Sequence, residues 1–226
     1  MKILVHKQGA VATVELNEPP YNPLSMALID ELEAAIRDLD EDTAIRVVIV
    51  RGAGTENFSV GADIREFGAA AAGPGVKEFI DQRLRVIRRI ETMRKPVVCS
   101  IRGACVGGGL ELALGCHFRI AAHGAKIGLP EVELGVVPAW GGTQRLTHTI
   151  GRARALEVML LARKLSADEA FDAGLLTAVC EPDELDALDE GLAHEYAALE
   201  RVASSEDLQE GVLAFFQKRP PNFKGK

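Results

Sequence analysis

The sequence is poor in aromatic residues and has no apolar run long enough to cross a membrane. Phe, Trp and Tyr make up 5% of the 226 residues. The longest apolar runs are like the one at 47–50, far short of the roughly 20 residues that a transmembrane helix needs. The N-terminus, MKILVHKQG, also lacks the apolar stretch of a signal peptide. We therefore expect a cytoplasmic protein without a membrane partner.

Cysteine and histidine are scarce, and neither is spaced as in a metal site. There are four cysteines without a CxxC pair, and the five histidines are scattered along the chain. The sequence therefore predicts buried free thiols in a reducing compartment and no metal. The cysteines are Cys99, Cys105, Cys116 and Cys180.

The net charge of −7 argues against a protein that holds a polyanion by bulk charge. Most of the acidity lies in residues 181–210, which hold eleven acids and one base, whereas residues 1–180 carry a net charge of −1. One basic stretch, residues 83–95, has six bases and one acid. It indicates a solvated helix face or, as an alternative, an RNA-binding module built on Arg85, Arg88 and Arg89, although we expect no nucleic-acid partner.

The composition that remains, 47% hydrophobic and 26% charged, is typical of a globular domain. Apolar periodicity predicts strands at 3–5, 10–16, 46–50, 97–101, 118–122 and 175–179. It predicts helices after Ser25, at 76–93, 143–150 and 152–162, after Ser166 with a capping box to Glu169, and at 182–199. Strand, helix and strand over 46–101 form a βαβ unit, so the fold class is α/β with a parallel sheet. We divide the chain softly into residues 1–180 and a helical region at 181–226.

Two glycine-containing turns, at 57–64 and 103–111, follow predicted parallel strands, where α/β proteins bind ligands. Neither fits a nucleotide-binding GxGxxG or P-loop pattern. The triplet Gly107–Gly109 runs directly into a predicted helix, so its free N–H groups could hold an oxyanion. The alternative is a tight turn without a ligand.

Glu111 follows this triplet and is the only polar side chain between Gly107 and Cys116. If the helix is internal, its carboxyl group is desolvated and its pKa is raised, which is typical of a functional acid. The alternative is an exposed position. Glu131 and Glu133, after a third turn at 128–135, are ordinary helix-start residues by their pattern alone.

A different chemistry is suggested by Gly103-Ala-Cys105-Val-Gly107. Small residues flank the cysteine between a strand and a helix, as in a nucleophile elbow. Cys105 is thus a candidate nucleophile of a thiol acyl hydrolase, although nothing in the sequence selects a histidine partner among His117, His123 and His148.

The same turns resemble the enoyl-CoA hydratase/isomerase (crotonase) family. The resemblance is carried by FSVGADI at 58–64, IRGACVGGGLELALGCHFRIA at 101–121, IGLPEVELGVVPAWGGTQRL at 127–146 and the C-terminal residues 206–226. It implies a spiral of ββα units, a C-terminal helical trimerisation region and a homotrimer or dimer of trimers. It also implies the hydration of a 2-trans-enoyl-CoA to a 3-hydroxyacyl-CoA in fatty acid β-oxidation, with coenzyme A as part of the substrate and no cofactor.

By this resemblance, Val60 and Gly108 donate the two N–H groups of an oxyanion hole for the thioester oxygen. The stretch Val60, Gly61, Ala62 and Asp63 then also contacts coenzyme A. Glu111 activates water and Glu131 transfers a proton at C2, while Glu133 matches no functional position. The alternative within the family is a 3-enoyl to 2-enoyl-CoA isomerase, which usually keeps only the later glutamate.

The chain departs from the family pattern in two places. His117 stands where Asp is frequent. The region from Ala198 to Glu206 is shorter than in typical members by roughly one helical hairpin, which in the family supplies trimer contacts and part of the coenzyme A pocket.

Overall fold

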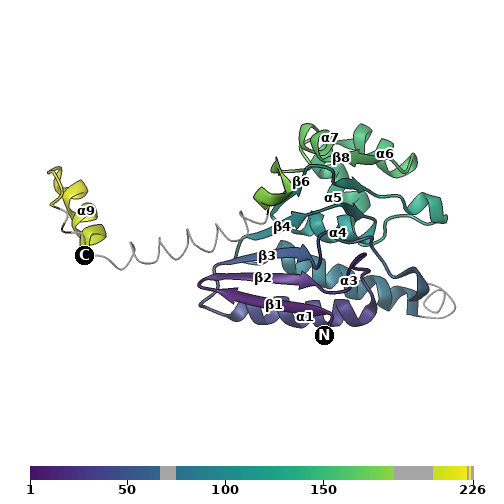
Figure 1. The fold of residues 1–226 in the computed structure, drawn as a ribbon, viewed down its shortest axis with the longest axis horizontal. Helices are drawn as coiled ribbons and strands as arrows, with labels where there is room; N and C mark the ends of the chain where they lie inside the picture. Colours follow the sequence, from purple (N-terminus) through teal and green to yellow (C-terminus); the bar gives the residue numbers. More distant parts are fainter. Residues whose placement is uncertain (67–74, 186–205, 223, 225–226) are drawn as a thin grey trace.

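A six-stranded sheet forms the centre of the computed structural model, which describes residues 1–66, 75–185, 206–222 and 224 (Figure 1). The strands β1 and β2 form an antiparallel hairpin, and each later strand runs parallel to its neighbour. This confirms the predicted hairpin and parallel sheet. The spatial order is β1 (Ile3–Gln8), β2 (Val11–Leu16), β3 (Val47–Gly52), β4 (Val97–Ile101), β6 (Phe118–Ala122) and β9 (Ala178–Cys180).

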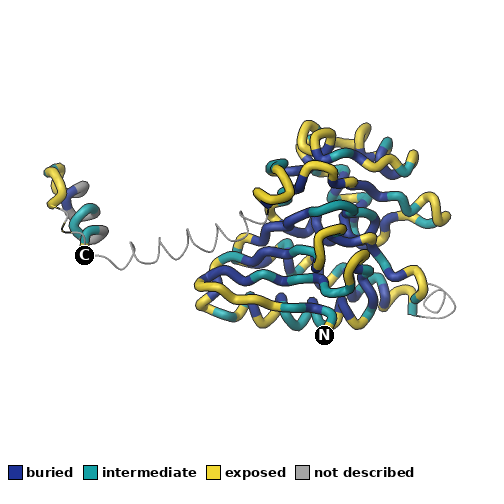
Figure 2. The backbone as a smooth tube through the Cα atoms, viewed as in Figure 1, coloured by how far each residue is buried: buried dark blue, intermediate teal, exposed yellow. Residues whose placement is uncertain are grey.

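Two long helices, α1 (Met26–Glu41) and α3 (Gly75–Glu91), pack against each other, and α1 also packs on the hairpin. Ser25 caps α1 as predicted, since its Oγ accepts a hydrogen bond from Leu28 N at 3.3 Å. The apolar residues of α1 recur every three or four positions and are buried, which gives the dark interior in Figure 2. The helix therefore forms because its apolar stripe has a sheet and a helix to cover it.

A second, three-stranded sheet was not predicted. It comprises β5 (Ala104–Val106), β7 (Lys126–Gly128) and β8 (Lys164–Ser166). Each strand has three residues, too few for a periodic signal, and the sequence analysis assigned residues 103–107 to a turn. The elements around this sheet are α4 (Gly108–Gly115), the 3-10 helix η1 (Glu131–Leu134), α5 (Gly142–Ile150), α6 (Arg152–Leu160) and α7 (Ala167–Asp172).

Two predictions near the C-terminal end of the core have different outcomes. The capping box of Ser166 and Glu169 at the start of α7 is confirmed. The strand predicted at 175–179 is shifted, because Leu175 and Leu176 are buried in the connection after α7 and pairing with β6 begins at Ala178.

The C-terminal region is described only in part. Residues 182–185 are helical, and the rest of the helix predicted to 199 lies outside the described residues, as does most of the predicted shortening at 198–206. Figure 1 draws α9 (Glu206–Gln217) apart from the sheets. In the part of the chain that the structure describes, no helix has the length and apolarity needed to span a membrane.

Candidate active site

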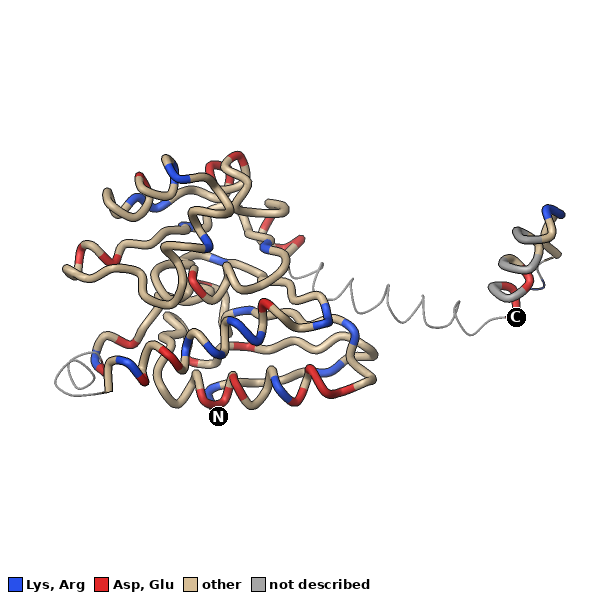
Figure 3. Tube along the Cα trace, turned by 180° about the vertical axis from the view of Figure 1, so that it is seen from behind, with Lys and Arg blue, Asp and Glu red and all other residues tan. Residues whose placement is uncertain are grey.

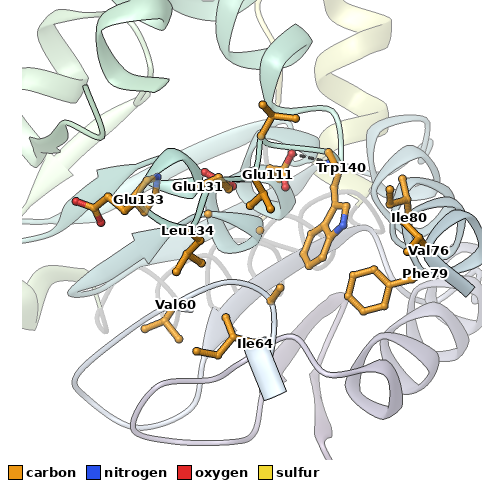
Figure 4. Close-up of a pocket in the computed structure, with 17 residues that line it drawn as sticks. Val60, Ile64, Val76, Phe79, Ile80, Glu111, Glu131, Glu133, Leu134 and Trp140 are labelled. Atoms are coloured by element: carbon orange, nitrogen blue, oxygen red, sulfur yellow. Dashed lines mark hydrogen bonds between the residues drawn. The ribbon is translucent and has the colours of Figure 1, made fainter. Parts of the chain in front are cut away.

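A cavity of about 430 Å³ lies beside the N-terminus of α4. Most of its wall is apolar, and the carboxyl-bearing side chains in it are those of Glu111, Glu131 and Glu133 (Figure 4). The structure thus brings together predicted site residues from three separate segments. Those that line the cavity are Val60, Ala62, Gly108, Glu111 and Glu131.

Gly61 and Asp63 lie beside the cavity and not in its wall. A Cβ on Gly61 would lie only 2.8 Å from Gly108 N, so this glycine lets the two turns approach each other. The Asp63 carboxylate is buried and accepts hydrogen bonds from Arg65 Nε at 2.8 Å and Nη2 at 2.6 Å. The bonds to Arg65 hold the Asp63 pKa below its usual value, so this carboxylate serves the turn itself.

The structure corrects one of the two predicted oxyanion donors. Val60 N donates to Tyr21 O at 3.0 Å and Gly61 N to Ser59 Oγ at 3.1 Å, so both amides are already used. The amides of Ala62 and Gly108, by contrast, have no acceptor among the described residues, and both residues line the cavity. The free pair is therefore Ala62 and Gly108, because the amide of Val60 points to the backbone of residue 21.

Glu111 is held inside the protein by the turn before α5. Its side chain is 2% exposed, so the alternative of an exposed position is wrong. Its Oε1 accepts hydrogen bonds from Trp140 N at 2.7 Å and Gly142 N at 2.8 Å. Burial raises the Glu111 pKa to about 7, and the nearby charge of Glu131 also raises it. The hydrogen bonds from Gly142 N and Trp140 N act in the opposite direction and lower it.

The turn that holds Glu111 is itself fixed by an ion pair between helices. Arg145 of α5 donates from Nη1 to Trp140 O at 3.0 Å. The same guanidinium donates two hydrogen bonds to the Glu91 carboxylate of α3, from Nε at 3.2 Å and from Nη2 at 3.1 Å. This fork geometry connects α3 to the residues whose amides orient Glu111.

Glu131 begins η1 directly after Pro130 and approaches the start of α4. A Cβ on Gly107 would lie 3.5 Å from its Oε1. Its Oε2 is buried and has no hydrogen-bond partner within the described chain, and burial raises its pKa. Two carboxyl groups with raised pKa values thus face one apolar cavity, an arrangement suited to proton transfer near neutral pH.

Cys105 does not have the setting of a nucleophile. It lies in β5, fully buried, and burial raises the pKa of its thiol far above the usual value. One proposed partner, His117, instead accepts a hydrogen bond at Nδ1 from Val97 N at 3.0 Å. Cys99, Cys105 and Cys116 are buried free thiols as predicted, whereas Cys180 is only half-buried.

Cys105→Ala is therefore expected to leave any acyl-CoA reaction of this protein unchanged in kcat, because the thiol is buried in a strand. Assays of the variant on a saturated and an unsaturated acyl-CoA check this. Loss of a thioester hydrolysis in Cys105→Ala would revive the thiol mechanism.

The basic stretch at 83–95 does not form a continuous positive face. Arg83 is fully buried, and Lys95 Nζ donates to Asp42 O at 2.6 Å. Arg88 pairs with Glu91 at 2.8 Å. Figure 3 shows acidic residues interspersed with the bases on α1 and α3, so the charges give no support to the RNA-binding alternative.

Two contributors to the site were missed by the sequence analysis: the Ala62 amide and the 140–142 turn. A backbone amide is present in every residue except proline, so the residue type does not reveal its role. The direction of an N–H group depends on which strand or turn its neighbours pair with. The signal that could have pointed to the 140–142 turn is the adjacent pair Gly141 and Gly142.

Comparisons with known proteins give matches in both sequence and fold. The family described as Enoyl-CoA hydratase/isomerase matches residues 6–187. The chain is 36% identical to a probable enoyl-CoA hydratase of Bacillus subtilis over 96% of each chain. It is 33% identical to a crotonyl-CoA hydratase of Syntrophomonas wolfei over 99% of this chain and 98% of the relative. A crystal structure of an enoyl-CoA hydratase from Bacillus anthracis superposes with a TM-score of 0.81 at 32% identity over the full length of both chains.

The alignment with the Bacillus subtilis relative spans 249 positions, more than the 226 residues of this chain. The relative therefore carries residues between the aligned ends that are absent here, in agreement with the predicted internal shortening. The match in sequence and the α/β crotonase-like fold lead to one conclusion. The chain belongs to the enoyl-CoA hydratase/isomerase family.

Proposed function

We propose that the protein is an enoyl-CoA hydratase, which adds water to a 2-trans-enoyl-CoA to give a 3-hydroxyacyl-CoA. The observation that carries this proposal is the pair Glu111 and Glu131, two carboxyl groups with raised pKa values in one apolar cavity. Addition of water needs a base to activate water for C3 and an acid to protonate C2. An isomerase needs only one group to move a proton.

In this proposal Glu111 activates the water and Glu131 supplies the proton to C2. Both hydrogen bonds from the 140–142 turn go to Glu111 Oε1, which leaves Oε2 for the water. The N–H groups of Ala62 and Gly108 receive the negative charge that develops on the thioester oxygen. Gly108 is the first residue of a buried helix, where the helix dipole places partial positive charge, so its amide binds a developing negative charge more strongly.

The substrate brings coenzyme A with it, and the reaction as written needs no redox cofactor, since no electrons are transferred. It also calls for no metal, because the two N–H groups stabilise the thioester oxygen and the two carboxyl groups transfer the protons. The exposed apolar rim, which includes Ile64, Leu134 and Val137, is where we place the entrance for the bulky thioester. A trimer or dimer of trimers remains a proposal by family resemblance, and light scattering of the purified chain measures it directly.

The hydratase proposal is tested by adding the protein to crotonyl-CoA. The conjugated-enoyl absorbance is expected to fall as 3-hydroxybutyryl-CoA forms. A matched assay with a 3-enoyl-CoA tests the isomerase alternative. Conversion of the 3-enoyl thioester without any hydration of crotonyl-CoA would overturn the proposal in favour of the isomerase.

Hydration is also expected to depend on pH with an acid limb near 7. Glu111 must be ionised to accept a proton from water, and its raised pKa of about 7 means that the base is lost as the pH falls below that value. The plot of log kcat/KM against pH should then have a slope of about one below pH 7. If kcat/KM instead falls as the pH rises above 7, Glu111 acts as the acid and Glu131 as the base, the reverse of the proposed roles.

A further inference from the structure

Arg83 is the most unusual buried residue outside the catalytic groups. It lies in the middle of α3, is 0% exposed and is the largest fully buried side chain among the described residues. Its Cζ lies 3.5 Å from the centroid of the Phe79 ring and 4.9 Å from that of the Trp140 ring. The guanidinium therefore stacks against two aromatic side chains that both line the cavity.

The Arg83 charge is balanced only weakly by nearby carboxylates. Glu66 Oε2 forms a long ion pair with Nη2 at 3.9 Å, and the charges of Glu66 and Asp30 favour the protonated guanidinium without offsetting its burial. Nε has no hydrogen-bond partner within the described residues. Burial lowers the Arg83 pKa to about 10, so the side chain stays protonated near neutral pH. A buried cation with so little compensation is destabilising compared with an apolar side chain of similar size.

Arg83 also contacts Met26 Sδ, at 2.8 Å from Nη1, and the backbone of two separate segments. Nη1 donates to Phe79 O at 3.0 Å, and Nη2 donates to Leu24 O at 3.2 Å. Leu24 N in turn donates to Gly61 O at 2.8 Å. The guanidinium thus fixes the Phe79 ring in place and ties α3 to the turn that carries Ala62.

The aromatic pair forms the buried side of the cavity. Phe79 and Trp140 are 5% and 4% exposed, with ring centroids 6.1 Å apart, whereas Ile64 and Leu134 on the rim are each 65% exposed. Figure 4 draws Ile64 and Leu134 on one side of the cavity and the two rings on the other. A thioester whose bulky end stays at the exposed rim must direct its acyl chain toward the rings.

We propose that Arg83 is a specificity-determining residue, which limits the substrate to short acyl chains by fixing the Phe79–Trp140 wall from behind. This deepens the proposed function and rests on it. Arg83 lies directly against the Phe79 ring, and its stacking on the ring and its hydrogen bond to Phe79 O hold Phe79 in place. A longer chain would have to displace both rings, of which Trp140 also lies against Gly108.

The test compares kcat/KM for crotonyl-CoA and 2-decenoyl-CoA in the wild type, Arg83→Ala and Arg83→Leu. The wild type is expected to prefer crotonyl-CoA. Arg83→Ala should raise the decenoyl-to-crotonyl ratio by about tenfold or more, since one methylene in an apolar pocket already changes such ratios by about tenfold. Arg83→Leu should raise the ratio less, and it should keep or raise Tm because it removes a buried charge.

Arg85→Ala is the matched control, because Arg85 is an exposed arginine on the same helix and should leave the ratio unchanged. An unchanged ratio in Arg83→Leu, or a wild type that hydrates both substrates equally well, would overturn the proposal. Binding of butyryl-CoA and decanoyl-CoA, measured by calorimetry, distinguishes failure of the Arg83 proposal from failure of the hydratase proposal. A length preference in binding that Arg83→Leu relaxes supports the role of Arg83 even if no hydration occurs.

Discussion

Glu111→Gln is expected to lower kcat for crotonyl-CoA hydration by about 10²- to 10⁴-fold, the contribution of one general acid or base. Glutamine keeps the size of the side chain, and its amide oxygen can still accept the hydrogen bonds from Trp140 N and Gly142 N that Glu111 Oε1 accepts. What is lost is the ability to take a proton from water. The loss should therefore appear in kcat more than in KM.

The same substitution is expected to stabilise the fold at neutral and alkaline pH. The Glu111 pKa is raised to about 7 in the folded protein from 4.5. The wild type therefore binds more protons folded than unfolded between these values, and its stability falls as pH rises through them. Because glutamine has no charge to bury, Glu111→Gln should gain up to about 3 kcal/mol relative to the wild type, fully present above pH 7.

Urea unfolding at pH 5 and pH 8, together with the hydration assay, measures both effects on one protein. Glu41→Gln, an exposed carboxyl at the end of α1, is the control and should change neither. Full hydration activity in a folded Glu111→Gln protein would contradict the proposed mechanism. If Glu111→Gln is less stable than the wild type at pH 8, burial of the Glu111 charge does not destabilise the fold as argued.

Gly108→Ala is expected to lower kcat by about 10²- to 10³-fold, comparable to the loss of one oxyanion donor. A Cβ at this position would overlap the Trp140 ring, so the ring or the start of α4 has to move. Either movement shifts the Gly108 amide away from the thioester oxygen. Because the donor is a backbone group, this steric route is the practical way to disturb it.

Trp140 is the only tryptophan of the chain, so its fluorescence reports the displacement directly. The emission of Gly108→Ala should shift to longer wavelength as the buried ring becomes more exposed. Gly75→Ala, where a Cβ meets no atom of the described residues within 4 Å, should alter neither the emission nor kcat. Normal kcat with a shifted emission would show that the Gly108 amide is not a donor.

The sequence was sufficient for elements with a strong periodic pattern. The helix after Ser25 and the strands at 46–50 and 97–101 were predicted because their apolar residues extend over enough positions to define a buried element, and the structure places β3 at Val47–Gly52 and β4 at Val97–Ile101. The three short strands of the second sheet were missed because three residues define no period. Pairing with distant segments, such as β5 with β7, makes them strands.

The candidate site was predicted in its side chains and missed in part of its backbone. Glu111 was identified because a lone carboxyl in an apolar helix is costly to bury. The choice of Val60 as a donor was wrong because Tyr21 O, nearly forty positions away in the sequence, takes its N–H. Arg83 was assigned to a basic stretch, since only the packed structure reveals that it turns inward and stacks on Phe79.

The helix α4 has one further consequence for the way this site responds to motion. Gly108 and Glu111 lie three residues apart, within one turn of a single buried eight-residue helix, so any displacement of the helix carries both together. We therefore expect the distance between them to change little when the helix moves. Glu131 stands on a separate 3-10 helix that has no buried residues, so we expect it to move independently of α4. Warming should therefore disturb the protonation of C2, which depends on Glu131, before it disturbs the addition of water at C3 and the polarisation of the thioester, which both depend on α4.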